Sequence, residues 1–274
     1  MTPLPYLSVL QVAGPDAGKF LQAQLSAQLG DLEAPTASFA AYCTAKGQVI
    51  ATMLVAPRGD DWLLLMESSL LEKVTGRLRQ FVMRDKVELH PRTDQYVFAV
   101  NPGDILLPGL VLLEPRSIPV QYGISDMEPQ PDSEVSARWR RSELLFGIPW
   151  LDLTHSEKYI PQMLGLDTIG AVSFSKGCYP GQEIIARARH LGEVKRRPLV
   201  LDLDGSRAPD TDSPCFIRSM GREVEAGLVH CVATSSNRFT VFAVAALKAD
   251  EPVRALEQDG HLWTATRVAN AHSA

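Results

Sequence analysis

The sequence predicts an α+β protein that ends in a separate, small all-β domain. Apolar residues at helical spacing alternate with short strand-forming runs up to about residue 145, whereas only strand-forming runs remain beyond residue 198. The chain has 274 residues, of which 45% are hydrophobic. This length and composition allow a sizeable core and two or three domains.

The first predicted elements are a helix and a strand pair. Residues 14–16, Gly-Pro-Asp, predict a helix start, because Pro suits the first helical position and Asp suits the positive end of the helix dipole. Apolar residues at helical spacing then continue as far as Leu29. Strands are predicted at residues 49–55 and 62–66, joined by a turn at residues 57–60.

A second helix is predicted to begin at residues 69–72, Ser-Leu-Leu-Glu, which form a capping-box pattern, and its apolar stripe extends over residues 70–82. Strands are predicted at residues 87–89 and 96–100, so the order of elements predicts an antiparallel sheet with a helical layer. Residues 102–131 contain six of the 19 prolines and predict an irregular connection at a domain edge.

The last third of the chain changes character. A helix is predicted over residues 136–145, ended by the Gly-Ile-Pro at 147–149. Five short strand-forming runs follow, separated by clusters of Gly, Pro and Asp, and this pattern is typical of a small β-barrel. They lie at residues 199–203, 215–218, 227–233, 239–247 and 262–268.

Charge and cysteine content exclude several classes of protein. A net charge of −5 argues against a general nucleic-acid or membrane-surface binder. No run approaches the roughly 18 apolar residues of a membrane span, and the N-terminus lacks the basic region of a secretory signal. The four cysteines form no Cys-x-x-Cys pair. We therefore expect a cytoplasmic protein with reduced thiols, no metal site and no membrane partner.

The segment at residues 175–183 contains the most informative chemistry. Residues 179–182, Tyr-Pro-Gly-Gln, predict a type II turn, because Pro occupies the second position and Gly the third. A helix is predicted over residues 182–191, with Gly192 ending it. A helix N-terminus favours anions, and an exposed Cys178 beside Lys176 would be a functional thiol with a lowered pKa.

Glu183 lies near the start of this helix and has two possible roles. Its carboxylate can accept two parallel N–H bonds from a planar donor pair, such as the one a pterin presents. Alternatively, it stabilises the helix start and pairs with Arg187 four residues later. Residues 176–197 contain six Lys or Arg against two Glu. This basic segment can meet the glutamate tail of a folate or an RNA phosphate, or simply face solvent.

The run Lys176-Gly177-Cys178-Tyr179-Pro180-Gly181-Gln182-Glu183 resembles the signature of the YgfZ-type folate-binding family. Further matches to this family follow in the expected order at residues 14–17, 20–22, 24–25, 42–43, 46–47, 84–85, 87–89, 147–149, 154, 161–162 and 166–167. Gln48 and Gly165 depart from the Arg and Asn that the family usually has. The family is similar to the glycine-cleavage T-protein, an aminomethyltransferase.

The resemblance implies a T-protein-like ring of three domains around a folate: two antiparallel-sheet α+β domains and a C-terminal β-barrel. The implied divisions are residues 1–45 with 125–195, residues 46–124, and residues 196–274. The implied cofactor is tetrahydrofolate or a derivative. Its implied contacts are Gln162, Asp167, Tyr179, Gln182, Glu183 and Arg187, and the implied reactive positions are Cys178 and Lys176.

The resemblance also implies a function: an accessory protein for the assembly or repair of [4Fe–4S] enzymes, with clients such as a tRNA methylthiotransferase. A monomer is expected. One alternative is a folate-dependent one-carbon transferase that uses Cys178. Residues 66–69, Met-Glu-Ser-Ser, stand where the T-protein has its Asn-led catalytic segment and supply no matching Asp, which disfavours a conventional enzyme. Direct RNA binding by the basic segment is a third hypothesis, disfavoured by the acidic chain.

Overall fold

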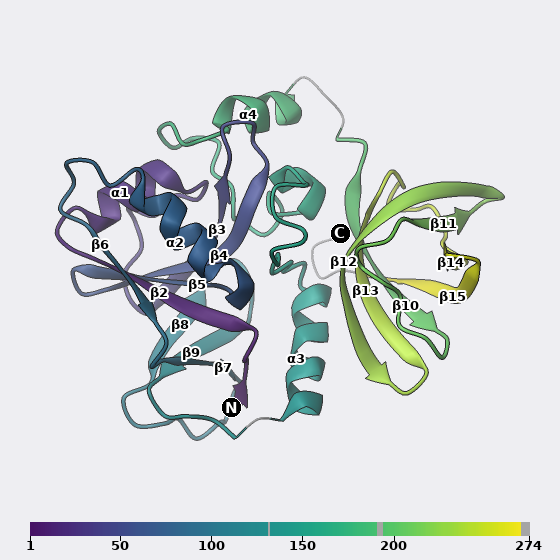
Figure 1. The fold of residues 1–274 in the computed structure, drawn as a ribbon, viewed down its shortest axis with the longest axis horizontal. Helices are drawn as coiled ribbons and strands as arrows, with labels where there is room; N and C mark the ends of the chain where they lie inside the picture. The colour runs from purple at the N-terminus through teal and green to yellow at the C-terminus, as the bar shows by residue number, and fades with distance from the viewer. Residues whose placement is uncertain (131, 191–193, 270–274) are drawn as a thin grey trace.

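The computed structural model describes residues 1–130, 132–190 and 194–269. A larger α+β part contains a nine-stranded curled sheet, and a closed six-stranded barrel lies beside it (Figure 1). The predicted α+β fold with a C-terminal barrel is therefore confirmed. Among the described residues, no helix is both long and apolar enough to cross a membrane.

The nine-stranded sheet is antiparallel except at one pair, because β3 and β8 run parallel. Strands β3, β4 and β5 are buried along nearly their whole length, and their runs of Ala, Val and Leu are typical of strands covered on both faces. The strand order is β1 (Thr2–Pro3), β7 (Tyr96–Val100), β9 (Gln121–Ser125), β8 (Val111–Pro115), β3 (Thr36–Cys43), β4 (Val49–Arg58), β5 (Asp61–Glu67), β2 (Leu7–Ala13) and β6 (Glu88–Arg92).

The irregular connection predicted for residues 102–131 is wrong, because β8 and β9 lie within it. The prolines do not prevent these strands, since they fall at a strand end or between strands. Pro115 is the last residue of β8, while Pro108 and Pro119 lie outside the ladders. Pro131 is outside the described residues.

The first helix, α1 (Ala17–Gln24), begins where the sequence predicts but ends earlier than its apolar spacing suggests. Leu25 already has an extended backbone with ψ of 156°. The second helix, α2 (Leu71–Arg79), follows a short 3₁₀ helix, η1 (Ser68–Leu70). The predicted capping box is wrong, because the carboxylate of Glu67 accepts the Ser69 N–H at 2.8 Å and caps η1 instead.

The barrel closes with every neighbouring pair antiparallel and has a hydrophobic core of its own. The five predicted strands are present, and a sixth, β14, was missed because it has only four residues. The strand order is β10 (Arg197–Asp204), β13 (Arg238–Ala245), β12 (Arg222–Ser235), β11 (Cys215–Ser219), β14 (Ala255–Gln258) and β15 (His261–Val268), which returns to β10.

The third helix, α3 (Ser133–Leu145), lies between the two parts (Figure 1). On the side of α3 that faces the larger part, the buried carboxylate of Glu143 accepts three hydrogen bonds. The donors are Tyr6 Oη and Tyr122 Oη at 2.7 Å each and Trp150 Nε1 at 2.9 Å. Burial raises the pKa of Glu143, and the three donors oppose that rise. Because the buried Glu143 carboxylate accepts all three hydrogen bonds, it fixes α3 to the sheet.

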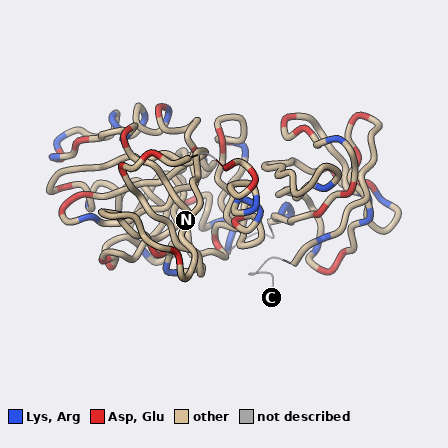
Figure 2. Tube along the Cα trace, turned by 90° about the horizontal axis from the view of Figure 1, so that it is seen from below, with Lys and Arg blue, Asp and Glu red and all other residues tan. Residues whose placement is uncertain are grey.

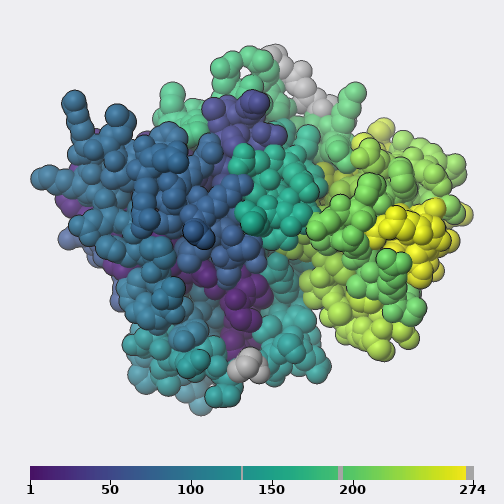
Figure 3. Space-filling view, in the orientation of Figure 1, coloured from purple at the N-terminus to yellow at the C-terminus, as the bar shows by residue number. Residues whose placement is uncertain are grey.

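The barrel contacts the larger part through α3 and the segment that follows it. Arg141 on α3 donates to Asp202 and Thr240 of the barrel at 2.9 Å each. The buried ring of Tyr159 abuts β12 at Gly227, where an added Cβ would lie 2.5 Å from the tyrosine oxygen. Figure 3 shows the teal-green segment near residue 160 packed between the two parts. The domain divisions at residues 45, 124 and 195 stay predictions.

Candidate functional site

The turn that bears Cys178 has the predicted geometry. The Tyr179 carbonyl accepts the Gln182 N–H at 3.2 Å, and Gly181 has a φ of 81°, in the left-handed region that favours glycine. Helix α4 (Gln182–His190) follows at once. The predicted turn and helix are confirmed, while Gly192, predicted to end the helix, lies outside the described residues.

This turn packs directly on the turn between β3 and β4. A Cβ added to Gly181 would lie 2.5 Å from both the Gly47 Cα and the Thr44 carbonyl oxygen. Gly47 also has a positive φ, of 76°, and a Cβ there would lie 3.2 Å from the Cβ of Ile184. Two glycine-bearing segments far apart in the chain therefore meet backbone to backbone, which fixes the position of the cysteine turn.

Lys176 is bound within the protein. Its ammonium group donates to the carbonyl oxygens of Gln22, Leu25 and Ala27 at 2.5, 2.7 and 2.9 Å. These carbonyls lie at and just beyond the end of α1, where a cation is favoured. Burial lowers the pKa of Lys176 to about 8. All three ammonium donors are thus occupied, which is the geometry of a structural cation; a catalytic role for Lys176 stays a prediction.

All four cysteines lie in the described part of the chain, and among them only Cys178 is exposed. Cys43 and Cys215 are buried, and burial raises the pKa of both thiols. The neighbouring Tyr179 is buried, and its hydroxyl has no hydrogen-bond partner among the described residues. The Cys178 side chain is therefore exposed to solvent, while the neighbouring Tyr179 ring anchors the turn in the protein interior.

Glu183 and Arg187 form an ion pair of 2.7 Å on the outer surface of α4, with side chains 80% and 58% exposed. An exposed pair at this spacing is typical of a helix surface. Gln182 is half-buried, and its Nε2 approaches the Lys176 carbonyl at 3.5 Å. The folate contacts predicted for Glu183, Arg187, Gln182 and Tyr179 stay predictions.

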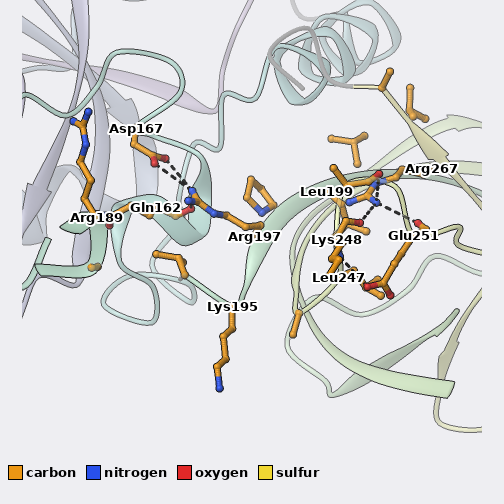
Figure 4. Close-up of a pocket in the computed structure, with 18 of the residues that line it drawn as sticks. Gln162, Asp167, Arg189, Lys195, Arg197, Leu199, Leu247, Lys248, Glu251 and Arg267 are labelled. Atoms are coloured by element: carbon orange, nitrogen blue, oxygen red, sulfur yellow. Dashed lines mark hydrogen bonds and ion pairs between the residues drawn. The ribbon is translucent and has the colours of Figure 1, made fainter. Parts of the chain in front are cut away.

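A cavity of about 940 Å³ brings together the other two predicted folate residues, Gln162 and Asp167. It lies where η2 (Pro161–Leu164) and α4 face the barrel (Figure 4). Six cationic side chains line it against two carboxylates. The cations are Arg189, Lys195, Arg197, Arg222, Lys248 and Arg267, and the carboxylates are Asp167 and Glu251.

The wall formed by the larger part is organised around Gln162, which is 1% exposed. Its Nε2 donates to the Ile185 carbonyl of α4 at 2.7 Å, whereas its Oε1 has no hydrogen-bond partner among the described residues. Arg197 donates to the Gln162 backbone carbonyl at 3.1 Å and pairs with Asp167 at 3.2 Å (Figure 4). On this wall, Asp167 therefore neutralises the charge of Arg197, and Gln162 Oε1 is an acceptor that lacks a donor among the described residues.

The barrel wall is formed by residues that the sequence did not identify. Arg267 donates to the carbonyls of Lys248 and Ala249 at 2.6 and 2.8 Å, and Arg222 pairs with Glu251. Figure 4 shows Arg267, Lys248 and Glu251 grouped on the barrel side, apart from the Arg197–Asp167 pair. These residues are separated in the sequence and form no motif, so no local signal could have found them.

Other charges are spread over the molecule. Figure 2 shows Lys and Arg intermixed with Asp and Glu on both parts, with basic segments also where the two parts meet. Within the described residues, no group of three or more His, Cys, Asp or Glu side chains could hold a metal ion.

The architecture is similar to that of the glycine-cleavage T-protein, so the fold is T-protein-like. The crystal structure of glycine cleavage system aminomethyltransferase T from Bartonella henselae matches 100% of this chain and 85% of its own, with a TM-score of 0.65 and 10% sequence identity. At that identity the likeness concerns the fold alone.

Sequence relatives then give the particular family resemblance. The chain is 27% identical over 228 residues to the tRNA-modifying protein YgfZ of Cronobacter sakazakii, covering 72% of this chain and 69% of the relative. It is 25% identical over 232 residues to the tRNA-modifying protein YgfZ of Yersinia pestis, covering 74% and 70%. No protein-family model matches the chain. The predicted resemblance to YgfZ-type proteins is confirmed.

Proposed function

We propose that this protein binds tetrahydrofolate or a derivative and serves as an accessory protein in the assembly or repair of [4Fe–4S] enzymes, including tRNA-modifying ones. The cavity between α4 and the barrel carries the proposal. Its volume of about 940 Å³ lies within the range of ligand sites, about 300–1,000 Å³. Its excess of cations suits the anionic glutamate end of a folate.

The residues of the cavity fit the other end of a folate as well. A buried acceptor without a partner costs about 1–3 kcal/mol, so a ligand N–H that reaches Gln162 Oε1 would remove that cost. Gln162, Asp167 and Arg197 would hold the ligand on this wall. Bound tetrahydrofolate would supply the chemistry of a one-carbon carrier.

Gln162 also connects the cavity to the exposed thiol. Its Nε2 holds the Ile185 carbonyl of α4, and α4 begins at the turn that bears Cys178. A ligand that fixes the Gln162 side chain therefore stabilises the base of the same helix. We assign Cys178 as the functional thiol offered to client proteins, because it is exposed on a turn held by backbone contacts.

Two observations bear on the alternative, a folate-dependent one-carbon transferase. The T-protein-like fold favours that alternative. In the segment at residues 66–69, however, the Glu67 carboxylate is used to cap η1 through the N–H and hydroxyl of Ser69. The name tRNA-modifying protein, borne by the relatives, supports the link to tRNA-modifying enzymes.

Calorimetric titration of tetrahydrofolate tests the proposal. We expect wild-type protein to bind and Gln162→Met, which keeps the side-chain length, to bind about tenfold more weakly, because one buried hydrogen bond to the ligand is lost. Glu183→Ala, altered on the outer surface of α4, tests the predicted contact of Glu183 separately: a ligand held only in the cavity leaves its affinity at the wild-type level, and a ligand that also reaches Glu183 binds this variant more weakly. Loss of binding in Glu183→Ala alone would move the site to the outer face of α4, and no binding by the wild type would refute the proposal.

A second arm separates the accessory role from the transferase. In cells lacking this protein, methylthiolation of tRNA should be restored by the wild type and by Cys231→Ser but not by Cys178→Ser. Purified Cys178→Ser should still bind tetrahydrofolate, because its thiol does not line the cavity. One-carbon transfer by the purified wild type that disappears in Cys178→Ser would instead favour the transferase.

A further inference from the structure

A second pocket, of about 530 Å³, lies on the larger part between α2 and the chain at Leu153. Lys73 on α2 donates to Ser156 Oγ at 2.9 Å and pairs with Glu157 at 2.8 Å. Ser69 Oγ accepts the Leu153 N–H at 3.0 Å. Figure 3 shows the blue α2 beside this teal-green segment at the surface. The two walls of the pocket are therefore tied together before any partner arrives.

Arg77, half-buried on α2, also lines this pocket, and its charge is not used in the same way as that of Lys73. Its Nε is buried and has no hydrogen-bond partner among the described residues, and the same holds for the hydroxyl of Tyr42. The two groups are neighbours, since the Arg77 guanidinium opposes the rise that burial causes in the pKa of Tyr42. A planar donor set of this kind suits the two oxygens of a carboxylate.

Gly76 lines the pocket from the middle of α2, where glycine weakens a helix relative to alanine. Its φ is not positive, and an added Cβ would meet nothing within 4 Å. No contact within the described chain therefore requires a glycine at this position. A partner that approaches the helix backbone closely would require one.

We propose that this pocket is the docking site of a client protein, which places a carboxylate on Arg77 and packs its backbone against Gly76. The inference rests on the proposed function, because it takes the client to be a [4Fe–4S] enzyme that modifies tRNA. An arginine beside an exposed apolar side chain, here Leu153, is typical of an interface centre. Glu72, nearer the start of α2, also lines the pocket. The complementary client surface is therefore acidic at Arg77 and not acidic at Glu72.

Biolayer interferometry with a purified tRNA methylthiotransferase as the probe tests the docking site. We expect Gly76→Ala and Arg77→Gln each to bind the probe about tenfold more weakly than the wild type, because a close approach or a charge-assisted pair is lost. The matched control Arg79→Gln, at an exposed arginine of α2 outside the pocket, should bind like the wild type. Gly76→Ala should also unfold at a higher urea concentration, because alanine favours the helix.

Weaker binding together with higher stability distinguishes a contact site from a structural one. Equal binding by all four proteins, no binding by the wild type, or a lower urea midpoint in Gly76→Ala would overturn the inference.

Tetrahydrofolate titration and tRNA methylthiolation in cells test the proposed function separately. Gly76→Ala and Arg77→Gln should bind tetrahydrofolate like the wild type, since the two pockets share no lining residue among those described. Loss of folate binding in these variants would assign the pocket to the ligand and overturn the docking site. Failure of the wild type in both assays would instead refute the proposed function.

Discussion

The ammonium group of Lys176 links the cysteine turn to the first helix of the chain. It closes the end of α1 by donating to three carbonyls, and two of them, those of Leu25 and Ala27, lie beyond the helix. The sequence places Lys176 two residues from Cys178, which suggests a cation acting on a thiol. In the structure its three N–H donors bind backbone carbonyls instead. This arrangement depends on where α1 ends, which the spacing of residues near Lys176 does not reveal.

The contribution of this cation can be measured by replacing it with methionine, which has a similar length and no charge. We expect Lys176→Met to lower the free energy of unfolding by about 2 kcal/mol, because hydrogen bonds from a charged donor are lost and carbonyls are left unsatisfied. Urea denaturation measures this loss. Lys46→Met, at an exposed lysine of the β3–β4 turn, is the control and should change stability by less than about 0.5 kcal/mol. Equal effects in both variants would contradict the structural role.

At the scale of elements, the site depends on two turns that meet through glycines. The β3–β4 turn brings Gly47, and the turn before α4 brings Gly181, each with positive φ. At Gly181 the backbone of the β3–β4 turn lies so close that no side chain fits, and at Gly47 an added Cβ would make a tight contact of 3.2 Å with the Ile184 side chain. Local chemistry predicts each turn separately, yet their contact joins residues more than 130 positions apart.

Substitution at these glycines tests the contact. Gly181→Ala should cost about 1–3 kcal/mol of unfolding free energy, because it places a Cβ against the Thr44 oxygen and strains a left-handed backbone. Gly177→Ala is the matched control within the same motif, since an added Cβ there meets nothing within 4 Å and its φ is not positive. We expect the control to stay close to the wild type in urea denaturation. A comparable loss in both variants would mean that the turn is merely intolerant of alanine.

The elements that the sequence predicts are those with local signals. Helix α3, the strands flanking Gly59 and five of the six barrel strands follow from apolar periodicity and turn residues. The early end of α1 and the strands β8 and β9 do not, because tertiary contacts decide them: Lys176 takes the carbonyls at the end of α1, and β8 pairs in parallel with β3. Periodicity carries no information on partners distant in the chain.

At the scale of the whole molecule, the cavity exists only because the barrel docks on the larger part. Gln162 and Asp167 could be identified from a family resemblance, but Lys248 and Arg267 come from the barrel and meet them only after docking. Docking depends on shape as well as charge. Arg141 bonds Asp202, and the ring of Tyr159 fits against a barrel strand where Gly227 has no side chain.

A compensating pair of substitutions can show that this fit holds the two parts together. Gly227→Ala places a Cβ 2.5 Å from the Tyr159 oxygen, and the ring is only 8% exposed and has little room to move, so we expect a loss of about 1–3 kcal/mol in unfolding free energy. Tyr159→Phe removes that oxygen, and the next ring atom lies 3.5 Å from the added Cβ, an ordinary contact.

The double variant should therefore recover most of the loss in unfolding free energy. A double-mutant cycle measures this coupling by urea denaturation. Tyr159→Phe alone should stay near the wild type, because it removes one oxygen and keeps the buried ring in place. If the oxygen is the obstacle, tetrahydrofolate affinity should fall in Gly227→Ala and return in the double variant. A loss that Tyr159→Phe does not rescue would mean that Gly227 acts within the barrel, and that docking depends on α3 instead.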